Sequence, residues 1–376
     1  MSKTAKDIKP DQDQSAGAIA APELPYQPCD PKNYRPIIGF IGCGGISAHH
    51  LRAYKEARYK VDVLCDLIEE RAKSRRDEYF PDAEITTNYH ELLDRPEIQV
   101  VDIATHPADR VKIIEDAIGA GKHVLSQKPF VLDLATGQRL VRLAKERGVT
   151  LAVNQNGRWA PHLGYMREAV RGGYVGDVLG IHVQLHWDHT WTKGTLFEKI
   201  EDLVLYDFAI HWFDFVSSLI PDRKVKRVFA SKSFAAGQEM KIPMLAQALV
   251  EFEGGQASLI FDAHTKYGAQ DTTYIAGSKG SISSIGTGLQ DQRLKYFTKD
   301  GVAEPQLHGS WFPDGFHGTM GEMLCAIEEK RSPLNNAEDN LQSLALAFAA
   351  IASANTGRPF EIGEITKLWT PTGGGK

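Results

Sequence analysis

The stretch IIGFIGCGGIS, residues 37–47, joins a short apolar run to a cluster of glycines. Gly42 and Gly44 occupy the first two positions of the pattern G-x-G-x-x-G, and Ser47 occupies the third. In this pattern the first glycine permits a tight turn, the second lets a pyrophosphate approach the backbone, and the third position needs a small residue where a helix packs on a strand. The stretch therefore predicts a strand, a phosphate-binding turn and a helix that begins near Ile46, with the phosphates at the helix N-terminus.

An acidic residue follows at the spacing that this fingerprint requires. Asp66 ends the next apolar run, VDVLCD (61–66), about twenty residues after the glycines. A carboxylate at this place binds the ribose hydroxyls of a dinucleotide and repels the extra phosphate of NADP. NAD is therefore the expected cofactor, and NADP is less favoured. The alternative is a glycine turn that binds nothing, with Asp66 as a simple strand-end acid.

Apolar runs alternate with helical stretches as far as residue 157. The later runs are VVDIAT (100–105), HVLSQK (123–128) and VTLAVNQN (149–156). Such alternation predicts a parallel sheet with helical crossovers, and the near-continuous Val, Ile and Leu content is typical of strands buried on both faces. We expect residues 36–157 to form a dinucleotide-binding Rossmann domain.

After residue 157, strand-like runs follow one another without intervening helices. The segment EFEGGQASLIF (251–261) places a Gly-Gly turn between two alternating runs, which predicts a β-hairpin. The other strand-like runs are 178–189, 224–234, 272–285 and 292–298, and helices are expected near 161–172, 316–330 and 337–356. Residues 158–376 are therefore expected to form a second domain with an antiparallel or mixed sheet.

Composition limits the possible partners and the location. The 376 residues carry a formal net charge of -5, which gives no indication of a nucleic-acid or membrane partner. The four cysteines lack CxxC spacing, which argues against a disulfide framework or a thiolate zinc site. The N-terminus lacks the apolar core of a signal peptide, and no apolar run reaches the ~18 residues that span a bilayer. We expect a cytoplasmic protein.

Residues 1–35 are polar, rich in Pro, Asp, Gln and Ala, and have little periodicity. This composition predicts an N-terminal arm that is extended or disordered. The alternative is an arm that packs on a neighbouring subunit through Leu24, Pro25, Tyr26 and Pro28.

Three residues suggest catalytic chemistry. Lys128 ends the fourth parallel strand, and ligands bind outside the carboxyl ends of such strands. Asp207 and His211 are four positions apart and therefore lie on one face of a predicted helix. Each residue also has an ordinary interpretation: a solvated strand end for Lys128, an N-cap for Asp207, and a core histidine for His211.

Taken together, these segments resemble a known family. GFIGCGG (39–45), Asp66, AGKHVLSQKP (120–129) and DFAIH (207–211) are similar to the glucose–fructose oxidoreductase/inositol dehydrogenase/rhizopine-catabolism (Gfo/Idh/MocA) family of NAD(P)-dependent enzymes. The resemblance covers nearly the whole chain beyond the arm. It implies an α/β Rossmann domain joined to a C-terminal α+β domain with a large, open, mostly antiparallel sheet, through which a dimer or tetramer forms.

The resemblance also implies roles for individual residues. Lys128 corresponds to the family's motif lysine, Asp207 to its helix aspartate and His211 to its catalytic histidine. In the implied mechanism His211 accepts the hydroxyl proton of the substrate, Lys128 stabilises the developing alkoxide, and Asp207 orients the pair. The cofactor carries the hydride.

The expected site residues fall into two overlapping sets. The cofactor set is Gly42, Cys43, Gly44, Gly45, Ile46, Asp66, Thr105, His106, Pro107, Arg110, Gln127, Lys128 and Asn156. The substrate set is Lys128, Arg158, Trp159, Trp187, Asp188, His189, Asp207 and His211. The chain departs from the family pattern at three positions: Gln127 replaces a glutamate, Arg110 a histidine and His106 a proline.

The expected activity is hydride transfer between NAD and a hydroxyl-bearing or keto carbon of a sugar, polyol or sugar derivative. One alternative is a redox-neutral enzyme that oxidises a glycoside, eliminates the aglycone and returns the hydride. Another is a nucleotide-binding sensor without catalysis. His186, Asp188 and His189 can also be interpreted as metal ligands, but they lack the helical spacing of known zinc motifs, and no metal is expected.

Overall fold

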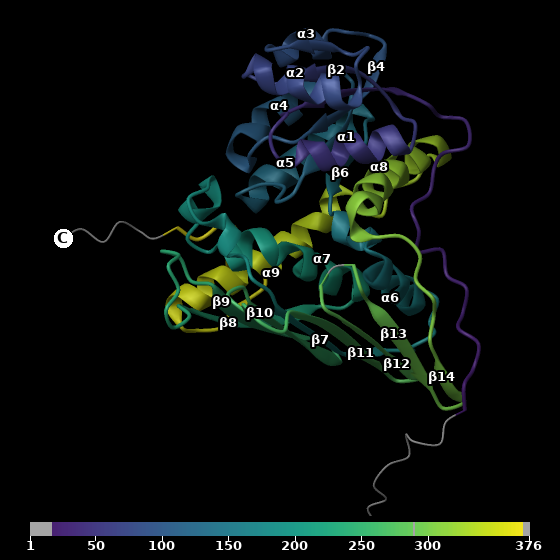
Figure 1. The fold of residues 1–376 in the computed structure, drawn as a ribbon, viewed down its shortest axis with the longest axis vertical. Coiled ribbons are helices and arrows are strands. Elements are labelled where there is room, and N and C mark those ends of the chain that lie inside the picture. The colour runs from purple at the N-terminus through teal and green to yellow at the C-terminus, as the bar shows by residue number, and fades with distance from the viewer. Residues whose placement is uncertain (1–16, 289, 371–376) are drawn as a thin grey trace, which may run out of the picture.

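The computed structural model describes residues 17–288 and 290–370. These residues form two layered domains, one above the other in the view of Figure 1. The upper domain contains a six-stranded parallel sheet in the order β3-β2-β1-β4-β5-β6, which is the strand order of a Rossmann fold. Its elements are β1 (Ile37–Ile41), α1 (Ser47–Glu56), β2 (Lys60–Cys65), α2 (Glu69–Tyr79), β3 (Glu84–Thr86), α3 (Tyr89–Leu93), β4 (Ile98–Ile103), α4 (Pro107–Gly119), β5 (His123–Gln127), α5 (Leu134–Arg147) and β6 (Leu151–Asn154).

The lower domain contains a nine-stranded sheet in the order β14-β13-β12-β11-β7-β10-β9-β8-β15. Only β7 and β10 pair in parallel, and the other neighbours are antiparallel. Its elements are a 3₁₀ turn (Asn156–Trp159), α6 (Pro161–Arg171), β7 (Val178–His186), 3₁₀ turns at Thr190–Thr192 and Leu196–Lys199, a π-helical turn (Val204–Phe208), α7 (Ile210–Leu219), β8 (Val225–Ser233), β9 (Leu245–Phe252), β10 (Gly255–Asp262), β11 (Gln270–Gly277), β12 (Gly280–Gly286), β13 (Arg293–Thr298), β14 (Gly301–Ala303), α8 (Trp311–Glu329), α9 (Ala337–Thr356) and β15 (Phe360–Glu361). The expected fold class, a parallel Rossmann sheet followed by a large and mostly antiparallel sheet, is confirmed.

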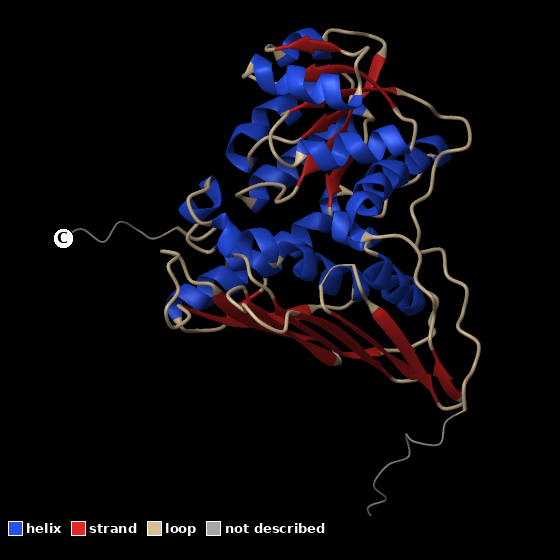
Figure 2. Cartoon of the chain, viewed as in Figure 1, coloured by secondary structure: helices blue, strands red, loops and turns tan. Residues whose placement is uncertain are grey.

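One face of the nine-stranded sheet is covered and the other is bare. Helices α6, α7 and α9 lie against the upper face in Figure 2, and no described helix lies on the lower one. The strands alternate accordingly: β9, for example, is buried at every second residue. The bare face carries large apolar side chains that are 40–55% exposed, namely Leu179, Phe229, Leu249, Tyr274 and Ile285.

The two domains share helices. Phe316, Met320 and Met323 of α8 belong to the same buried cluster as Phe40 of β1 and Leu51 of α1. The late helix α8 therefore packs on the first domain, although the change of pattern at residue 157 predicts it in the second.

Two further segments differ from their sequence patterns. The run 272–285 divides into β11 and β12, which pair as a hairpin around Ser278 and Lys279. The described part of the arm, 17–35, packs on its own chain: Ala18 bridges to Val302, and the buried Tyr26 accepts a hydrogen bond from the His308 N–H at 2.8 Å. Residues 1–16 of the predicted arm lie outside the described residues.

Among the described residues, no helix is long and apolar enough to cross a membrane. The cellular location stays a prediction.

Candidate active site

The glycine turn after β1 leaves room for a phosphate. Gly42 has a φ of +100°, and a Cβ there would lie 2.9 Å from the carbonyl carbon of Ala104, so this position requires glycine. At Gly44 and Gly45, in contrast, no described atom lies within 4 Å of the place where a Cβ would stand. Helix α1 begins directly afterwards, and Ile46 gives its free N–H groups no side-chain cap. Open space beside an uncapped helix N-terminus fits an anionic pyrophosphate.

Asp66 lies beside this turn. Its two carboxylate oxygens accept hydrogen bonds from the main-chain N–H groups of Cys43 and Ile68, each at 2.8 Å. The carboxylate is therefore fixed next to the glycines, at the end of β2, where ribose hydroxyls are expected.

Arg75 of α2 is a neighbour that sequence analysis missed. Its guanidinium donates to Ser47 Oγ at 3.0 Å and to the Gly44 carbonyl at 3.4 Å, which places a positive charge at the edge of the dinucleotide site. The run KSRR (73–76) was the only available signal, and it is also typical of a solvated helix face.

The predicted cofactor residues after β4 border the same edge of the sheet. Thr105 Oγ1 is buried and has no hydrogen-bond partner among the described residues. His106 is exposed, and Pro107 is the first residue of α4. Because β4 pairs with β1, these residues lie next to the glycine turn.

Lys128 and Asp207 meet between the two domains. Lys128 Nζ donates to the Asp207 carbonyl oxygen at 2.9 Å and lies 3.2 Å from its carboxylate oxygen Oδ1. Asp207 belongs to the π-helical turn and His211 to the first turn of α7, so the single α-helix that the spacing predicts is interrupted between them. Single π-helical turns are frequent at functional sites.

His211 faces the same region. Its ring lies 5.4 Å from the ring of Trp311 at an angle of 87°, and a Cβ on Gly157 would lie 3.4 Å from its Nδ1. Burial and, to a lesser degree, the positive charge of Lys128 hold the pKa of His211 well below its usual value. The imidazole is therefore neutral at neutral pH and can accept a proton.

Two of the predicted substrate residues form an aromatic wall beside Asp207. The rings of Trp187 and His189 stack at 5.4 Å and 12°, and the His189 ring lies 4.3 Å from Phe208. Burial lowers the pKa of His189 to about 4. Asp188, between them, is exposed, and it accepts a hydrogen bond from the Thr190 N–H at 2.9 Å, which stabilises the turn.

The structure places Arg158 and Trp159 in packing roles. Arg158 is buried and donates two hydrogen bonds to Asp214, at 2.6 and 2.8 Å. Trp159 is also buried, packed against Gly318 and under the guanidinium of Arg167. We therefore leave both out of the substrate site that we propose below.

Three predicted cofactor residues are turned toward protein atoms. Arg110 is buried and donates to the carbonyl oxygens of Thr105, Gln127 and Pro129, and burial lowers its pKa to about 10. Gln127 Oε1 accepts a hydrogen bond from the Lys128 N–H at 2.6 Å. Asn156 Oδ1 accepts one from Trp311 Nε1 at 2.7 Å. His186, which was also interpreted as a metal ligand, places its Nδ1 2.8 Å from Asp262, and the described residues contain no group of three or more His, Cys, Asp or Glu side chains that could hold a metal ion.

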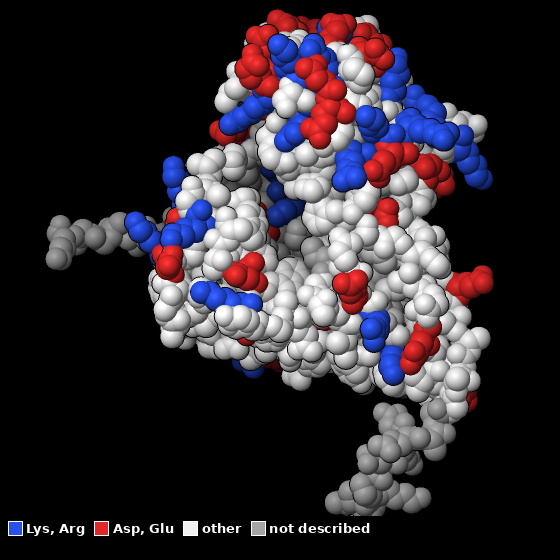
Figure 3. All heavy atoms as spheres, in the orientation of Figure 1, with Lys and Arg blue, Asp and Glu red and all other residues white. Residues whose placement is uncertain are grey.

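A deep hollow separates the two domains on the face shown in Figure 3, and basic atoms are visible at its floor.

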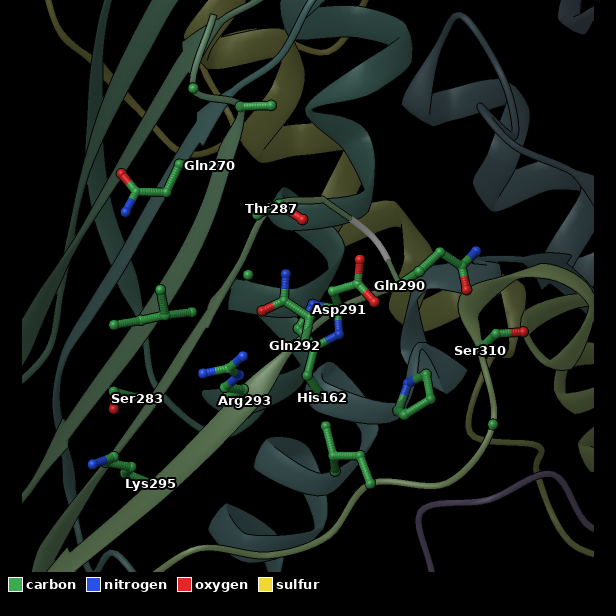
Figure 4. Close-up of a pocket in the computed structure, with 17 residues that line it drawn as sticks. His162, Gln270, Ser283, Thr287, Gln290, Asp291, Gln292, Arg293, Lys295 and Ser310 are labelled. Carbon is green, nitrogen blue, oxygen red and sulfur yellow. The ribbon is translucent and has the colours of Figure 1, made fainter.

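A second cavity, of about 1020 Å³, opens between the nine-stranded sheet and the start of α6 (Figure 4). Polar side chains such as Gln270, Asp291 and Arg293 line it, together with His162. Lys128, Asp207 and His211 are not part of its lining.

Comparison with known proteins agrees with this geometry. Residues 37–155 match the family described as "Oxidoreductase family, NAD-binding Rossmann fold", and residues 164–283 match the GFO/IDH/MocA C-terminal domain. Fold, glycine turn and matches together define an NAD-binding oxidoreductase, and the chain belongs to the Gfo/Idh/MocA family.

Named relatives share most of the chain at low identity. The D-apiose dehydrogenase of Paraburkholderia graminis is 26% identical, over 86% of this chain and 88% of the relative. The inositol 2-dehydrogenase of Rhizobium meliloti is 24% identical, over 86% and 98%. The fold is similar to that of an oxidoreductase from Agrobacterium radiobacter, solved with NAD+, L-tartaric acid and magnesium, with a TM-score of 0.77, 21% identity, and coverage of 88% and 99%.

Proposed function

We propose that this protein is an NAD-dependent dehydrogenase that transfers a hydride between the nicotinamide and a carbinol or keto carbon of a sugar, polyol or sugar derivative. The observation that carries the proposal is the contact of Lys128 Nζ with Asp207, beside the neutral imidazole of His211. Lys128 follows β5 at the carboxyl edge of the sheet that also holds the glycine turn, where ligands of open parallel sheets bind, and Asp207 of the second domain contacts it there.

Each of these residues has a distinct task in the proposed reaction. Lys128 donates a hydrogen bond to the reacting oxygen and stabilises its negative charge as the proton leaves. His211 accepts that proton, because its lowered pKa keeps it unprotonated. Asp207 holds the Lys128 ammonium in place through its carbonyl and carboxylate oxygens. Bound NAD would accept the hydride, or return it in the reverse direction.

Aromatic rings and fixed polar groups support a carbohydrate or polyol substrate. Trp187 and His189 are partly exposed, and their stacked rings lie next to Phe208, the neighbour of Asp207, where they can contact the C–H groups of such a molecule. The names of two relatives, D-apiose dehydrogenase and inositol 2-dehydrogenase, refer to compounds of this class.

The test is a screen of sugars, polyols and glycosides with NAD and with NADP, followed by NADH absorbance at 340 nm. We expect NAD-dependent turnover of at least one sugar or polyol, and loss of nearly all turnover in Lys128→Met. Lys112→Met, at an exposed site of α4, is the matched control. Wild-type turnover in Lys128→Met would refute the residue roles, and glycoside cleavage without NADH accumulation would favour the redox-neutral alternative.

We also propose that the bare face of the nine-stranded sheet binds a second copy of the chain. The exposed apolar side chains on this face, including Phe229, Leu249 and Ile285, would be removed from water in such a dimer or tetramer. Light scattering after gel filtration tests this proposal. We expect an oligomer for the wild type and a smaller species for Leu249→Glu, and a monomeric wild type would refute it.

A further inference from the structure

A buried chain of hydrogen bonds runs beneath the dinucleotide site, and neither the fingerprint nor the catalytic residues account for it. Its centre is His50 on α1, which is completely buried. His50 Nδ1 lies 2.7 Å from Asp102 Oδ2 on β4, and its Nε2 lies 3.0 Å from Gln127 Nε2 on β5. Asn154 on β6 places its Nδ2 3.0 Å from the same Nε2.

The directions of the hydrogen bonds that link Lys128, Gln127, His50 and Asp102 follow from the Lys128 end of the network. At one end the main-chain N–H of Lys128 can only donate, and Gln127 Oε1 accepts it at 2.6 Å. The other end of the Gln127 amide is then the NH₂ group, which donates to His50 Nε2. His50 Nε2 must therefore be unprotonated, and the ring proton is on Nδ1, where it points at the carboxylate of Asp102.

Aromatic rings and titratable side chains pack closely around His50 and fix the orientation of its ring. The rings of Phe40, Tyr54 and Phe316 pack around it at centroid distances of 5.6, 6.2 and 4.7 Å. Asp102 on β4 and Tyr54 and His49 on α1 are its titratable neighbours among the described residues. The Tyr54 hydroxyl donates to the same Asp102 oxygen at 2.5 Å. The network is buried and allows one orientation of the Gln127 amide.

We propose that His50, oriented by Asp102, is a positioning residue for Lys128. Through Gln127 it fixes the Lys128 N–H, while Arg110 binds the carbonyl oxygens of Gln127 and Pro129 on either side. The backbone from Gln127 to Pro129 is thus held at three points, which determines where the long side chain of Lys128 meets Asp207. The inference rests on the proposed role of Lys128 in hydride transfer.

The same geometry explains why an amide at position 127 suits this protein. A carboxylate there would accept from the Lys128 N–H equally well, but its second oxygen would face the unprotonated Nε2 of His50. Two acceptors would then oppose each other in a buried site, unless His50 took up a second proton. Gln127 avoids this conflict, so position 127 and His50 form a matched pair.

The first test observes the ring of His50 in the full-length wild-type protein and needs no turnover. Nitrogen-15 NMR of the imidazole, assigned by comparison with His50→Phe, should show an N–H at Nδ1 and an unprotonated Nε2 at neutral pH. A proton on Nε2, alone or together with one on Nδ1, would overturn the inference.

The second test is Gln127→Glu, with Gln138→Glu at an exposed site of α5 as the matched control. If His50 acts through the amide, the Gln127→Glu variant should show an imidazolium signal for His50. Where that extra proton is lost, its kcat should be roughly 10- to 100-fold below wild type, because the two opposed acceptors would displace Lys128 and a small displacement of a catalytic group has effects of this size. The KM for NAD should stay unchanged.

The pH profile separates positioning from simple loss of stability. The active form of Gln127→Glu would need one extra proton on His50, so its kcat should fall as the pH rises, with a limb that is absent from wild type and from Gln138→Glu. A Gln127→Glu variant with the kcat and pH profile of wild type would overturn the inference, although loss of turnover in Lys128→Met would leave the proposed function intact. If Gln127→Glu does not fold, the wild-type ring signal decides.

Discussion

The guanidinium of Arg110 donates to the carbonyl oxygen of Pro129 at 2.7 Å, directly after the lysine that the proposed mechanism uses. It also donates to the carbonyl oxygen of Gln127, directly before that lysine. A single buried side chain therefore binds the carbonyl oxygens of both residues that flank Lys128. The guanidinium suits this task because it carries several donors in one rigid plane, which an ammonium lacks.

Arg110→Lys should lower kcat by about tenfold or more, since a compact ammonium cannot reach carbonyl oxygens that Arg110 contacts from separate nitrogens of its guanidinium, and Lys128 would lose part of its support. The KM for NAD should change little. Steady-state kinetics with a substrate from the screen checks this expectation. Arg139→Lys, at a half-exposed site of α5, is the control, and equal kcat values for the two variants would contradict the assignment.

Asp66→Ser should weaken the binding of NAD and allow NADP to bind. Losing the hydrogen bonds that the ribose hydroxyls would donate to this carboxylate should cost about 1.5–3 kcal/mol of binding free energy. This corresponds to roughly a 10- to 100-fold increase in the KM for NAD. NADP should be accepted better because Arg75 lies nearby, 3.0 Å from Ser47 Oγ. Asp66 also accepts hydrogen bonds from two main-chain N–H groups, and their loss would lower stability. The thermal midpoint of unfolding is therefore measured in parallel. An unchanged KM for NAD in a folded variant would show that Asp66 does not bind the cofactor.

The activity of the wild type should persist below the pH at which an ordinary histidine becomes protonated. Burial and the charge of Lys128 lower the pKa of His211, so the imidazole stays unprotonated, and active as a base, as the pH falls through ~6.5. The pH dependence of kcat/KM checks this directly. An acid limb centred near ~6.5 that reports on His211 would contradict it.

His162 should make the fold sensitive to acid. Burial lowers its pKa to about 3 and its Nε2 has no partner among the described residues, whereas an unfolded histidine titrates near ~6.5. Below ~6.5 the unfolded state binds a proton that the folded state does not, so stability falls with pH, by about 2 kcal/mol at pH 5. Urea unfolding of His162→Phe should show a loss between pH 7 and pH 5 that is smaller by this amount. His90→Phe, at an exposed site, should show the full loss.

Asp214→Asn should destabilise the protein by about 3–5 kcal/mol, because it leaves the guanidinium of Arg158 buried without its carboxylate. If Arg158 serves packing alone, the KM for the sugar should remain unchanged in the folded fraction. Urea unfolding and steady-state kinetics measure the two effects separately. A raised KM for the sugar at unchanged stability would show that Arg158 belongs to the substrate site.

Much of the architecture could be predicted because it depends on local patterns of apolar residues, glycines and charges. The apolar runs that end at Ile41 and Cys65 predict two strands, and the glycine after the first run predicts a turn. These features depend on residues that are neighbours along the chain, so the sequence contains them. The spacing of Asp207 and His211 placed both residues near one helix face, although the π-helical turn between them could not be read from composition. Lys128 was identifiable because the end of a parallel strand faces the ligand crevice.

The sequence by itself thus determined the class of fold, the dinucleotide turn and the candidates for catalysis. Only the tertiary structure decided which polar side chains serve chemistry and which serve packing. Arg158 finds Asp214 fifty-six positions away, and His50 finds Asp102 and Gln127 at separations of 52 and 77. Hydrogen-bond partners of a buried group are set by which strands and helices lie side by side, and no local window of the chain contains that information.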